Sequence, residues 1–326
     1  MCIECTVPRF SAFSPRFLPP STDHIVRCRP CVTMEAVLVT IGESVKTLRP
    51  QWLRAPAPVG ENYRELKSLI DGMGLHTVCE SAACPNIGDC WNRRTATFMI
   101  LGNVCTRRCG FCAVQKGAPL EVDYDEPRRV AEAAAAMGLR YAVVTSVNRD
   151  DRKDGGAELF ALTIHAIRER IPGCRVEVLV PDFQGSRSAM EIVMDAHPDV
   201  LNHNTETVPR LYRQVRLGAR YERSLDMLEC AKEISPGTPT KSGLMLGLGE
   251  TVDEVLGVMR DLRAHGVDIL TLGQYLRPSP RHLPIVRYVP PCEFDDLRRA
   301  GYDMGFGHVE AGPLVRSSYH ASEAVA

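Results

Sequence analysis

The sequence lacks the features that mark membrane-spanning and nucleic-acid-binding proteins. No apolar run approaches the roughly 20 residues that a helix needs to cross a bilayer. No stretch gathers basic residues into the stripe expected of a nucleic-acid-binding face, and the 39 Lys and Arg nearly balance the 40 Asp and Glu. The chain has 326 residues, of which 44% are hydrophobic and 24% charged. This composition predicts a globular protein with one large domain or two small ones, and neither a membrane nor a nucleic-acid partner.

Residues 1–33 lack the periodicity of helices and strands, and their only acidic residues are Glu4 and Asp23. Three interpretations stay open: a disordered segment, an organelle transit peptide, or an untranslated stretch that precedes a start at Met34. We expect a cytoplasmic protein, or one of the mitochondrial or plastid matrix if the segment is a transit peptide.

Thirteen cysteines are many for a chain with no visible signal peptide, and their clustering favours metal binding over disulfides. Two C-x₂-C pairs, Cys2 with Cys5 and Cys28 with Cys31, leave a zinc ribbon as one alternative for the N-terminal segment. The proline-rich, strand-poor surroundings disfavour it, because a ribbon needs a tight β-turn around each pair.

The most informative stretch holds Cys105, Cys109 and Cys112 at C-x₃-C-x₂-C, directly after an apolar run that predicts a strand over 97–101. Three thiolates at this spacing can hold three corners of a [4Fe–4S] cluster. The fourth iron then keeps an open position that can bind and activate a small molecule. A disulfide pair with one free thiol is an alternative, as is zinc, which would need a fourth ligand nearby.

A second triad precedes the first. Cys79, Cys84 and Cys90 stand at C-x₄-C-x₅-C, in a segment that Pro85 and Gly88 predict to be a loop. A loop lets three thiolates converge, so we expect a second cluster there. A structural zinc site or an electron-relay cluster stays open as an alternative.

Strand and helix patterns alternate from residue 97 onward, which predicts a parallel sheet. The predicted strands are 97–101, 141–147, 175–180, 199–202, 240–246 and 269–272. The predicted helices are 61–73, 126–137, 156–170, 188–196, 224–234, 251–265 and 293–304. Ser224 and Thr251 are expected N-caps, with Glu254 completing a capping box after Thr251. About six βα units fall short of the eight that close a TIM barrel.

Polar residues follow several of these strands. Chemistry in βα barrels sits at the carboxyl ends of the strands. That rule selects Thr145 and Ser146 after the second strand, and Asn204 and Glu206 after the fourth. The alternative is that these side chains only cap helices or turns.

The first triad, with the aromatic Phe111 before its last cysteine, resembles the motif of the radical S-adenosylmethionine (SAM) enzymes. The two triads together resemble the lipoyl synthase family of that superfamily. The resemblance runs from about residue 50 to residue 321. It includes 277–284, where Arg277 departs from the family's usual Gln, and the Arg-Ser-Ser-Tyr sequence at 316–319.

This resemblance implies an α/β fold: a partial (β/α)₆ TIM-type barrel with N-terminal and C-terminal extensions covering its mouth. It implies SAM and two [4Fe–4S] clusters as cofactors. The six cysteines of the triads would be catalytic, with Ser318 as the fourth ligand of the auxiliary cluster at Cys79, Cys84 and Cys90. Thr145 and Ser146 would lie at the SAM amino group, and Asn204 and Glu206 at its ribose.

The implied activity is insertion of sulfur at C6 and C8 of an octanoyl chain on a lysine of a carrier protein, with the auxiliary cluster as sulfur donor. The implied carriers are the E2 subunits of 2-oxoacid dehydrogenases and the glycine cleavage H protein. The resemblance also implies a low-potential electron donor (ferredoxin or flavodoxin) and an iron–sulfur carrier for cluster repair. We expect the enzyme to be a monomer. Alternatives are a biotin synthase-like or methylthiotransferase-like enzyme and, from another class, a non-enzymatic two-cluster electron carrier.

We expect four parts along the chain. Residues 1–33 are the ambiguous leader and 34–94 an extension with the auxiliary-cluster loop. Residues 95–290 form the barrel, and 291–326 close the auxiliary site.

Overall fold

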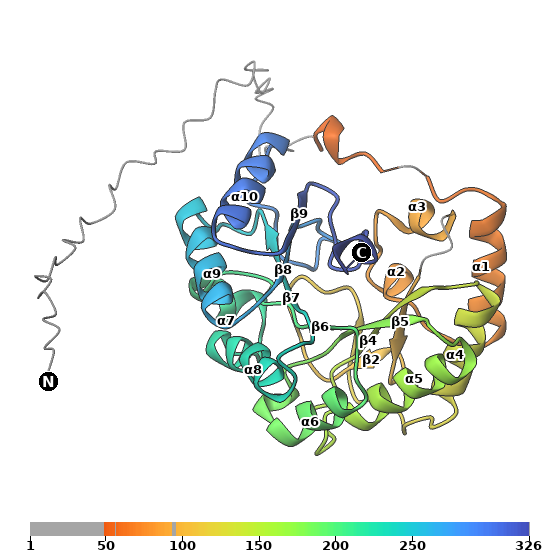
Figure 1. Ribbon diagram of the computed structural model, residues 1–326. Helices are drawn as coiled ribbons and strands as arrows, with labels where there is room; N and C mark the ends of the chain where they lie inside the picture. Colours follow the sequence, from red (N-terminus) through yellow and green to blue (C-terminus); the bar gives the residue numbers. More distant parts are fainter. Residues whose placement is uncertain (1–48, 56, 93–95, 326) are drawn as a thin grey trace, which may run out of the picture. The chain divides into compact units, whose positions relative to one another are not determined.

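The computed structural model of the chain describes residues 49–55, 57–92 and 96–325 (Figure 1). The leader, its two cysteine pairs and Met34 lie outside these residues. Within the described part, no helix is both long enough and apolar enough to span a bilayer.

Seven parallel strands form one sheet in the order β1-β4-β5-β6-β7-β8-β9. They are β1 (Thr97–Ile100), β4 (Tyr141–Ser146), β5 (Arg175–Leu179), β6 (Val200–Asn202), β7 (Thr240–Leu246), β8 (Ile269–Gln274) and β9 (His308–Gly312). Among the described residues, β1 and β9 are not paired with each other, so the barrel is open between them. The helices that follow the strands lie around the outside of the sheet (Figure 1).

The six predicted strands and the α/β class are confirmed. The seventh strand, β9, was not predicted, because its sequence His-Val-Glu-Ala-Gly is short and offers only two buried side chains. A second sheet, which pairs β2 (Val104–Cys105) with β3 (Gln115–Lys116), was missed for the same reason of length.

The helices agree with their predicted spans to within three residues at each end. They are α1 (Glu61–Gly72), α4 (Glu126–Ala136), α5 (Ala157–Arg170), α6 (Arg187–Asp195), α7 (Tyr212–Val215), α8 (Tyr221–Ile234), α9 (Val252–Ala264) and α10 (Pro291–Asp303); α7 was not predicted. The described residues also contain four 3₁₀ turns: η1 (Gln51–Leu53), η2 (Phe183–Gly185), η3 (Pro209–Leu211) and η4 (Glu323–Val325). The capping box of Thr251 and Glu254 at α9 is confirmed.

Two local predictions were wrong. Ser224 is not an N-cap: α8 begins at Tyr221 with Arg220 in the N-cap position, so Ser224 lies one turn inside the helix and is fully buried. The segment 79–90 is not a plain loop either. It holds two short helices, α2 (Val78–Ser81) and α3 (Ile87–Asn92), because Thr77 caps the first by accepting a bond from the Glu80 backbone N–H.

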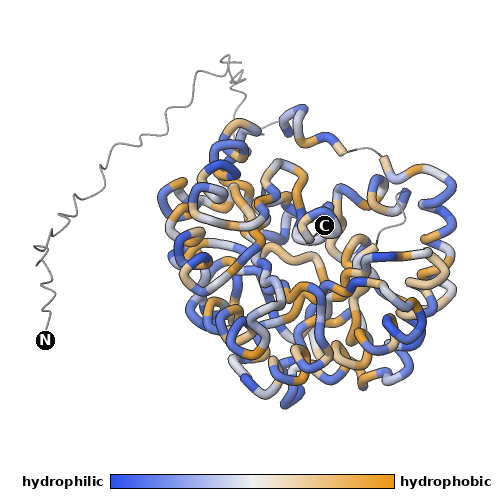
Figure 2. The backbone as a smooth tube through the Cα atoms, in the orientation of Figure 1, coloured by the Kyte–Doolittle hydropathy of each residue, from blue (hydrophilic) through white to orange (hydrophobic). Residues whose placement is uncertain are grey.

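The strands are nearly continuous runs of buried residues, as expected of a parallel sheet covered by helices. The strand segments are mostly hydrophobic, whereas the outer helices mix hydrophobic and hydrophilic residues (Figure 2). The interior also contains charge. Lys241 Nζ lies 3.0 Å from Glu177 Oε1, and both side chains are only 1% exposed.

Tyr141 and Asn202 complete this buried group. The Tyr141 hydroxyl donates to Glu177 at 2.7 Å and the Asn202 amide donates to Glu177 at 2.9 Å. The pair is therefore hydrogen-bonded on several sides, which is what makes a buried ion pair tolerable.

We predict that Lys241→Met lowers the free energy of unfolding by about 3–5 kcal/mol, because it leaves the Glu177 carboxylate buried without its cation. Lys67→Met removes a lysine that pairs at the surface with Asp71 and Glu80, and it is expected to cost only about 1 kcal/mol. Urea unfolding of both variants, followed by circular dichroism, measures the difference. Equal losses of unfolding free energy in the two variants would show that the buried pair does not contribute more to stability than the exposed lysine.

Candidate active site

A cavity of about 310 Å³ lies at the carboxyl ends of the strands. Every strand of the main sheet, or the loop directly after it, contributes to its wall. The contributors include Met99, Thr145, Ser146, Leu179, Asn204, Glu206, Met245, Gly273 and Arg316, together with Cys105, Cys109 and Cys112. The four polar residues that the sequence selected after the strands therefore meet at one cavity with the first cysteine triad.

The loop of the first triad is fixed by backbone bonds to two other loops. The Thr106 N–H donates to Asn148 O at 3.1 Å, and the Gly110 N–H donates to Val215 O at 2.9 Å. The Asn148 N–H points at Cys105 Sγ, 3.3 Å away. The three thiols are free of disulfides, so the alternative of a disulfide pair has no support here.

Arg107, inside the triad, ties this loop to the barrel. Its Nε and Nη2 donate to Asp150 at 2.7 and 2.8 Å, and Nη2 also donates to Asp182 at 2.5 Å. Arg223 holds the other oxygen of Asp182 at 2.9 Å. Burial would raise the pKa of Asp182, but the two guanidinium groups hold that pKa below its usual value. The position of the triad therefore depends on three loops: its own loop and the loops that follow β4 and β5.

The first triad offers a donor set that suits a cluster. Cys105, Cys109 and Cys112 lie in one short segment and line one cavity, and the charges of Cys105 and Cys109 act on Cys112. Thiolates are the usual ligands of iron–sulfur clusters, and each of these three would bind a different iron. The donor set therefore fits the cluster.

Burial favours the protonated form of Cys109 and Cys112 in the absence of metal. It raises the pKa of Cys112 to about 11 and also raises the pKa of Cys109, where the Arg216 guanidinium opposes it. Binding a metal must therefore release protons from this loop.

Buried polar atoms without partners line the same cavity. Ser146 Oγ, Asn148 Oδ1 and Asn204 Oδ1 have no hydrogen-bond partner within the described residues. Orphaned buried polar atoms are costly, so a polar ligand that supplied donors and acceptors would fit here. Thr145 differs, because its hydroxyl already donates to Leu179 O at 3.0 Å. Thr145 and Ser146, the two predicted ligand contacts, are the last residues of β4, and only Ser146 has a side-chain group free to bind a ligand.

Glu206 lies at the floor of the cavity in a left-handed backbone conformation, with φ of 67°. Asn204 Nδ2 donates to it at 3.2 Å. Burial raises the pKa of Glu206, and the charges of Arg216 and Arg316 oppose that shift. A carboxylate on a strained backbone, near two arginines, is a feature of a binding site rather than of a core.

Arg216 was missed by the sequence analysis. Its Nη1 donates to Asn204 O and the Tyr212 hydroxyl, each at 2.8 Å, and its Nε has no partner among the described residues. A lone arginine fourteen residues beyond the end of β6 gives no sequence signal, because only the fold returns it to the cavity. His203, which also lines the cavity, is structural: its ring nitrogens lie 2.8 Å from Val180 O and 3.0 Å from Ser224 Oγ.

The second triad is carried by α2 and α3 beside the free edge of β1. Thr77 forms an antiparallel bridge with Phe98 of β1. Cys79 is buried, and burial followed by the charge of Cys84 raises the pKa of its thiol to about 11. Burial lowers the pKa of Arg316, and the charges of Cys84 and Glu206 oppose this shift, so Arg316 lies near a cysteine of the second triad and near Glu206.

Ser318 lies with the second triad. Cys90 and Ser318 line one small cavity of about 50 Å³, with Tyr141 of β4 as part of its wall. The C-terminal segment reaches this place because β9 returns it to the sheet and Asn86 Nδ2 donates to Leu314 O at 2.7 Å. The structure thus brings Ser318 beside a cysteine that lies 228 residues earlier in the chain.

Gly273 makes room for this segment. A Cβ at that position would lie 2.1 Å from Val315 O and 3.3 Å from Arg316 Nη1. Only glycine therefore lets the C-terminal segment lie this close to β8.

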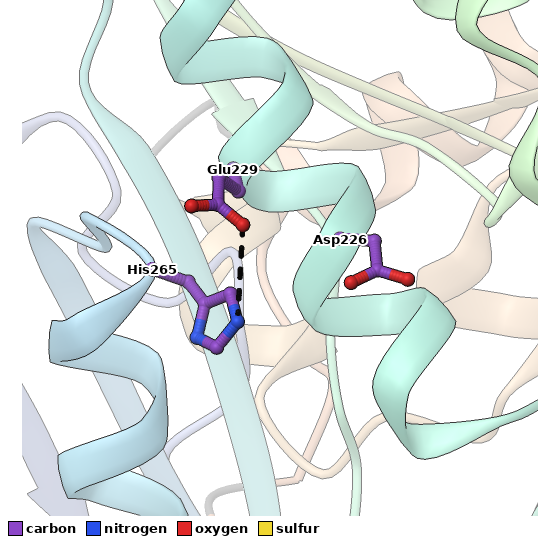
Figure 3. Close-up of side chains that lie close together, drawn as sticks. All are labelled: Asp226, Glu229 and His265. Carbon is purple, nitrogen blue, oxygen red and sulfur yellow. Dashed lines mark ion pairs between the residues drawn. The ribbon is translucent and has the colours of Figure 1, made fainter.

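One other group of ligand-type side chains is close together among the described residues: Asp226, Glu229 and His265 (Figure 3). Two of these side chains are exposed, and His265 Nε2 lies 3.9 Å from Glu229 Oε2. This is the geometry of a surface ion pair, and it lies on α8 and at the end of α9, away from the cavity residues.

The fold and the triad define a class. Residues 99–262 match the radical SAM superfamily, and the chain belongs to it. Residues 35–84 match the N-terminal domain of lipoyl synthase. The chain is 66% identical over 275 residues to the lipoyl synthase of Koribacter versatilis, covering 84% of this chain and 90% of that one. It is 64% identical to the lipoyl synthase of Rubrobacter xylanophilus, covering 84% and 86% of the two chains.

The chain belongs to the lipoyl synthase family. It is an enzyme, a sulfurtransferase of the radical SAM type, and SAM and a [4Fe–4S] cluster follow from that membership. Among solved structures, the [FeFe]-hydrogenase maturase HydG superposes with a TM-score of 0.51 at 15% identity, covering 82% of this chain and 60% of HydG. At that identity the likeness shows the fold alone.

We predict that Arg107→Lys disrupts the first triad, because lysine cannot donate to Asp150 and Asp182 together in the fork geometry of arginine. Iron content after reconstitution is expected to fall by about four per chain, the content of one cube. Arg108→Lys is the matched control, since Arg108 is exposed and has no ion pair in the described part of the chain. If Arg107→Lys keeps its full iron content, the network is not what holds the triad.

Proposed function

We propose that this enzyme inserts sulfur at C6 and C8 of an octanoyl chain held in amide linkage on a lysine of a carrier protein. The observation that supports this most directly is that two separate cysteine triads lie at the mouth and open side of one barrel. Residues flanking the second triad (Val78, Ala82, Ala83 and Pro85) line the same cavity as Cys105, Cys109 and Cys112.

In this proposal each triad holds one cluster. Cys105, Cys109 and Cys112 bind the cluster that leaves an iron open for SAM. Cys79, Cys84, Cys90 and Ser318 bind an auxiliary cluster. When bound, these groups supply a 5′-deoxyadenosyl radical from SAM and sulfur from the auxiliary cluster. The protein positions them and the acyl chain against one another.

The cavity residues take distinct positions around SAM. Ser146 Oγ and the backbone after β4 face the amino group. Asn204 and Glu206 face the ribose, and the orphaned Asn204 Oδ1 accepts from a hydroxyl. Gly243 of β7 lines the cavity and would let the ligand lie against backbone, because it has no side chain. A Cβ there would lie 2.4 Å from Thr271 Oγ1.

The remaining wall suits an acyl chain. Met99, Phe111, Leu244 and Tyr275 line the cavity, and most of its surface is apolar. Apolar walls with a few convergent polar groups are typical of small-molecule sites. They also keep water away from the carbon atoms that lose hydrogen.

Ser318 would give the auxiliary cluster one hard oxygen ligand among three soft thiolates. Thiolates match iron–sulfur clusters better than an alkoxide does. The iron at Ser318 is therefore the one we expect to leave first when the cluster gives up sulfur. A cluster consumed in this way has to be rebuilt, which requires an iron–sulfur carrier.

The partners, the oligomeric state and the location of the enzyme are also part of this proposal. The carriers are E2 subunits or the glycine cleavage H protein, and the electron donor is a ferredoxin or flavodoxin. The enzyme acts as a monomer in the cytoplasm, with the organelle matrix as the alternative if residues 1–33 direct it there. The boundaries at residues 33, 94 and 290 stay predictions.

We predict that Cys105→Ala abolishes SAM cleavage, because the first cluster loses a ligand. Cys84→Ala is expected to keep cleavage but lose sulfur insertion. Deoxyadenosine and thiolated peptide, measured by mass spectrometry with an octanoyl-lysyl peptide, separate the two outcomes. Cys230→Ala, which removes a lone thiol on α8, is the control and should change neither product. If both triad variants cleave SAM normally, the roles of the triads are wrongly assigned.

We predict that Gly273→Ala displaces residues 315–318 and so detaches Ser318 from the second triad. The expected result is faster loss of auxiliary iron to a chelator, with SAM cleavage retained. Gly257→Ala in α9 is the matched control, because its Cβ would meet nothing within 4 Å. Equal rates of iron loss in the two variants would contradict the role of Ser318.

A further inference from the structure

A second cavity of about 420 Å³ lies between the loops that follow β4 and β5. It is lined mainly by polar and charged residues from 148–153 and 181–186. Asn148 and Pro181 line this cavity and the main cavity alike. The second cavity therefore adjoins the main cavity, and we call the second one the rim cavity.

The rim cavity is preformed. Gln184 Nε2 donates to Asp150 O at 3.2 Å, which ties its two loops together, and Arg107 holds the Asp150 carboxylate from below. Phe183, Gln184 and Gly185 are consecutive residues with φ of 41°, 53° and 85°. Left-handed conformations at two non-glycine residues in a row cost of order 1 kcal/mol each and persist only where the surroundings enforce them. Such strain is typical of sites that bind a ligand.

Most charged side chains that line the rim cavity form ion pairs, but one does not. Both carboxylates are paired: Asp150 with Arg107 at 2.7 Å, and Asp151 with Arg149 at 2.8 Å. Arg152 is paired with Asp154 at 2.9 Å. Lys153 is exposed and has no ion pair among the residues that the structure describes. Among the described residues that line it, the rim cavity thus presents one unpaired positive charge, that of Lys153, and no unpaired negative charge.

We propose that the rim cavity binds the polypeptide on either side of the acylated lysine, and that Lys153 pairs with an acidic side chain of that segment. This inference rests on the proposed function, because it takes the acyl chain to occupy the main cavity. A lysine whose acyl group enters there leaves its own backbone at the rim. The rim cavity adjoins the acyl site and is lined mainly by polar residues, and the polar groups of a peptide backbone need such partners.

The test uses two synthetic heptapeptides with Nε-octanoyl-lysine at the centre, one flanked by glutamates and the other by glutamines. Binding to the anaerobically reconstituted enzyme is measured by fluorescence anisotropy at low and high salt. The wild type is expected to bind the glutamate peptide about 5-fold more tightly at low salt, and the preference should shrink at high salt through screening.

Lys153→Glu is expected to abolish or reverse this preference while leaving the affinity for the glutamine peptide and SAM cleavage unchanged. Arg170→Glu makes the same charge change at the exposed end of α5 and should keep the preference. A wild type without preference, or a Lys153→Glu variant that keeps it, overturns the proposal. So does a Lys153→Glu variant that slows flavodoxin-driven SAM cleavage but keeps the preference, because the rim cavity would then serve the electron donor.

The two proposals can fail separately. Failure of the proposed function would appear as no sulfur on either peptide with the wild type. Failure of the rim-cavity proposal would appear as normal sulfur insertion with no dependence on Lys153 or on flanking charge.

Discussion

The open side of the barrel is the constraint on which the rest of the structure depends. A parallel sheet that stops at seven strands leaves the edges of β1 and β9 without strand partners. Backbone groups at such edges need hydrogen bonds. At the β1 edge, the segment before the strand supplies these bonds: Met99 donates to His76 O, and Thr77 forms a bridge with Phe98. Beyond β9, Leu314 accepts a bond from Asn86, which brings the C-terminal segment and Ser318 to the side of Cys90. The segments before β1 and after β9 therefore both contribute residues beside the second triad.

The hydrogen-bond network around Asp182 positions both the first cysteine triad and the loops that line the cavities. Arg107 joins the first cysteine loop to the loops after β4 and β5, and Arg223 on α8 holds the same carboxylate. The triad, the wall of the main cavity and the rim cavity are therefore positioned by one buried carboxylate. Because breaking a buried pair leaves an uncompensated charge, these loops cannot easily move apart one at a time.

Periodicity and cysteine spacing were sufficient for the α/β class, six strands, the long helices and the grouping of Cys105, Cys109 and Cys112 with Ser146, Asn204 and Glu206. These features are local, or follow from the rule that strand ends converge. The sequence did not reveal Arg216, the strand β9 or the rim cavity. Arg216 carries no pattern, β9 has two buried side chains, and the rim cavity exists only because two loops are tied through Gln184 and Asp150. Ser224 was misplaced because a serine at a helix start looks like a cap until Tyr212 and Arg216 are seen to bond to it.

The bond between Asn86 and Leu314 joins residues 228 positions apart. Contacts of such long sequence separation form late, since the intervening chain must be ordered before they can close. During synthesis, the thiols near Asn86 leave the ribosome long before Ser318 does. Under the proposed function, the auxiliary site is therefore incomplete for most of translation, and iron delivered early would meet three thiols and no serine. In that proposal, loading of the auxiliary cluster belongs to the finished polypeptide, as a step of maturation.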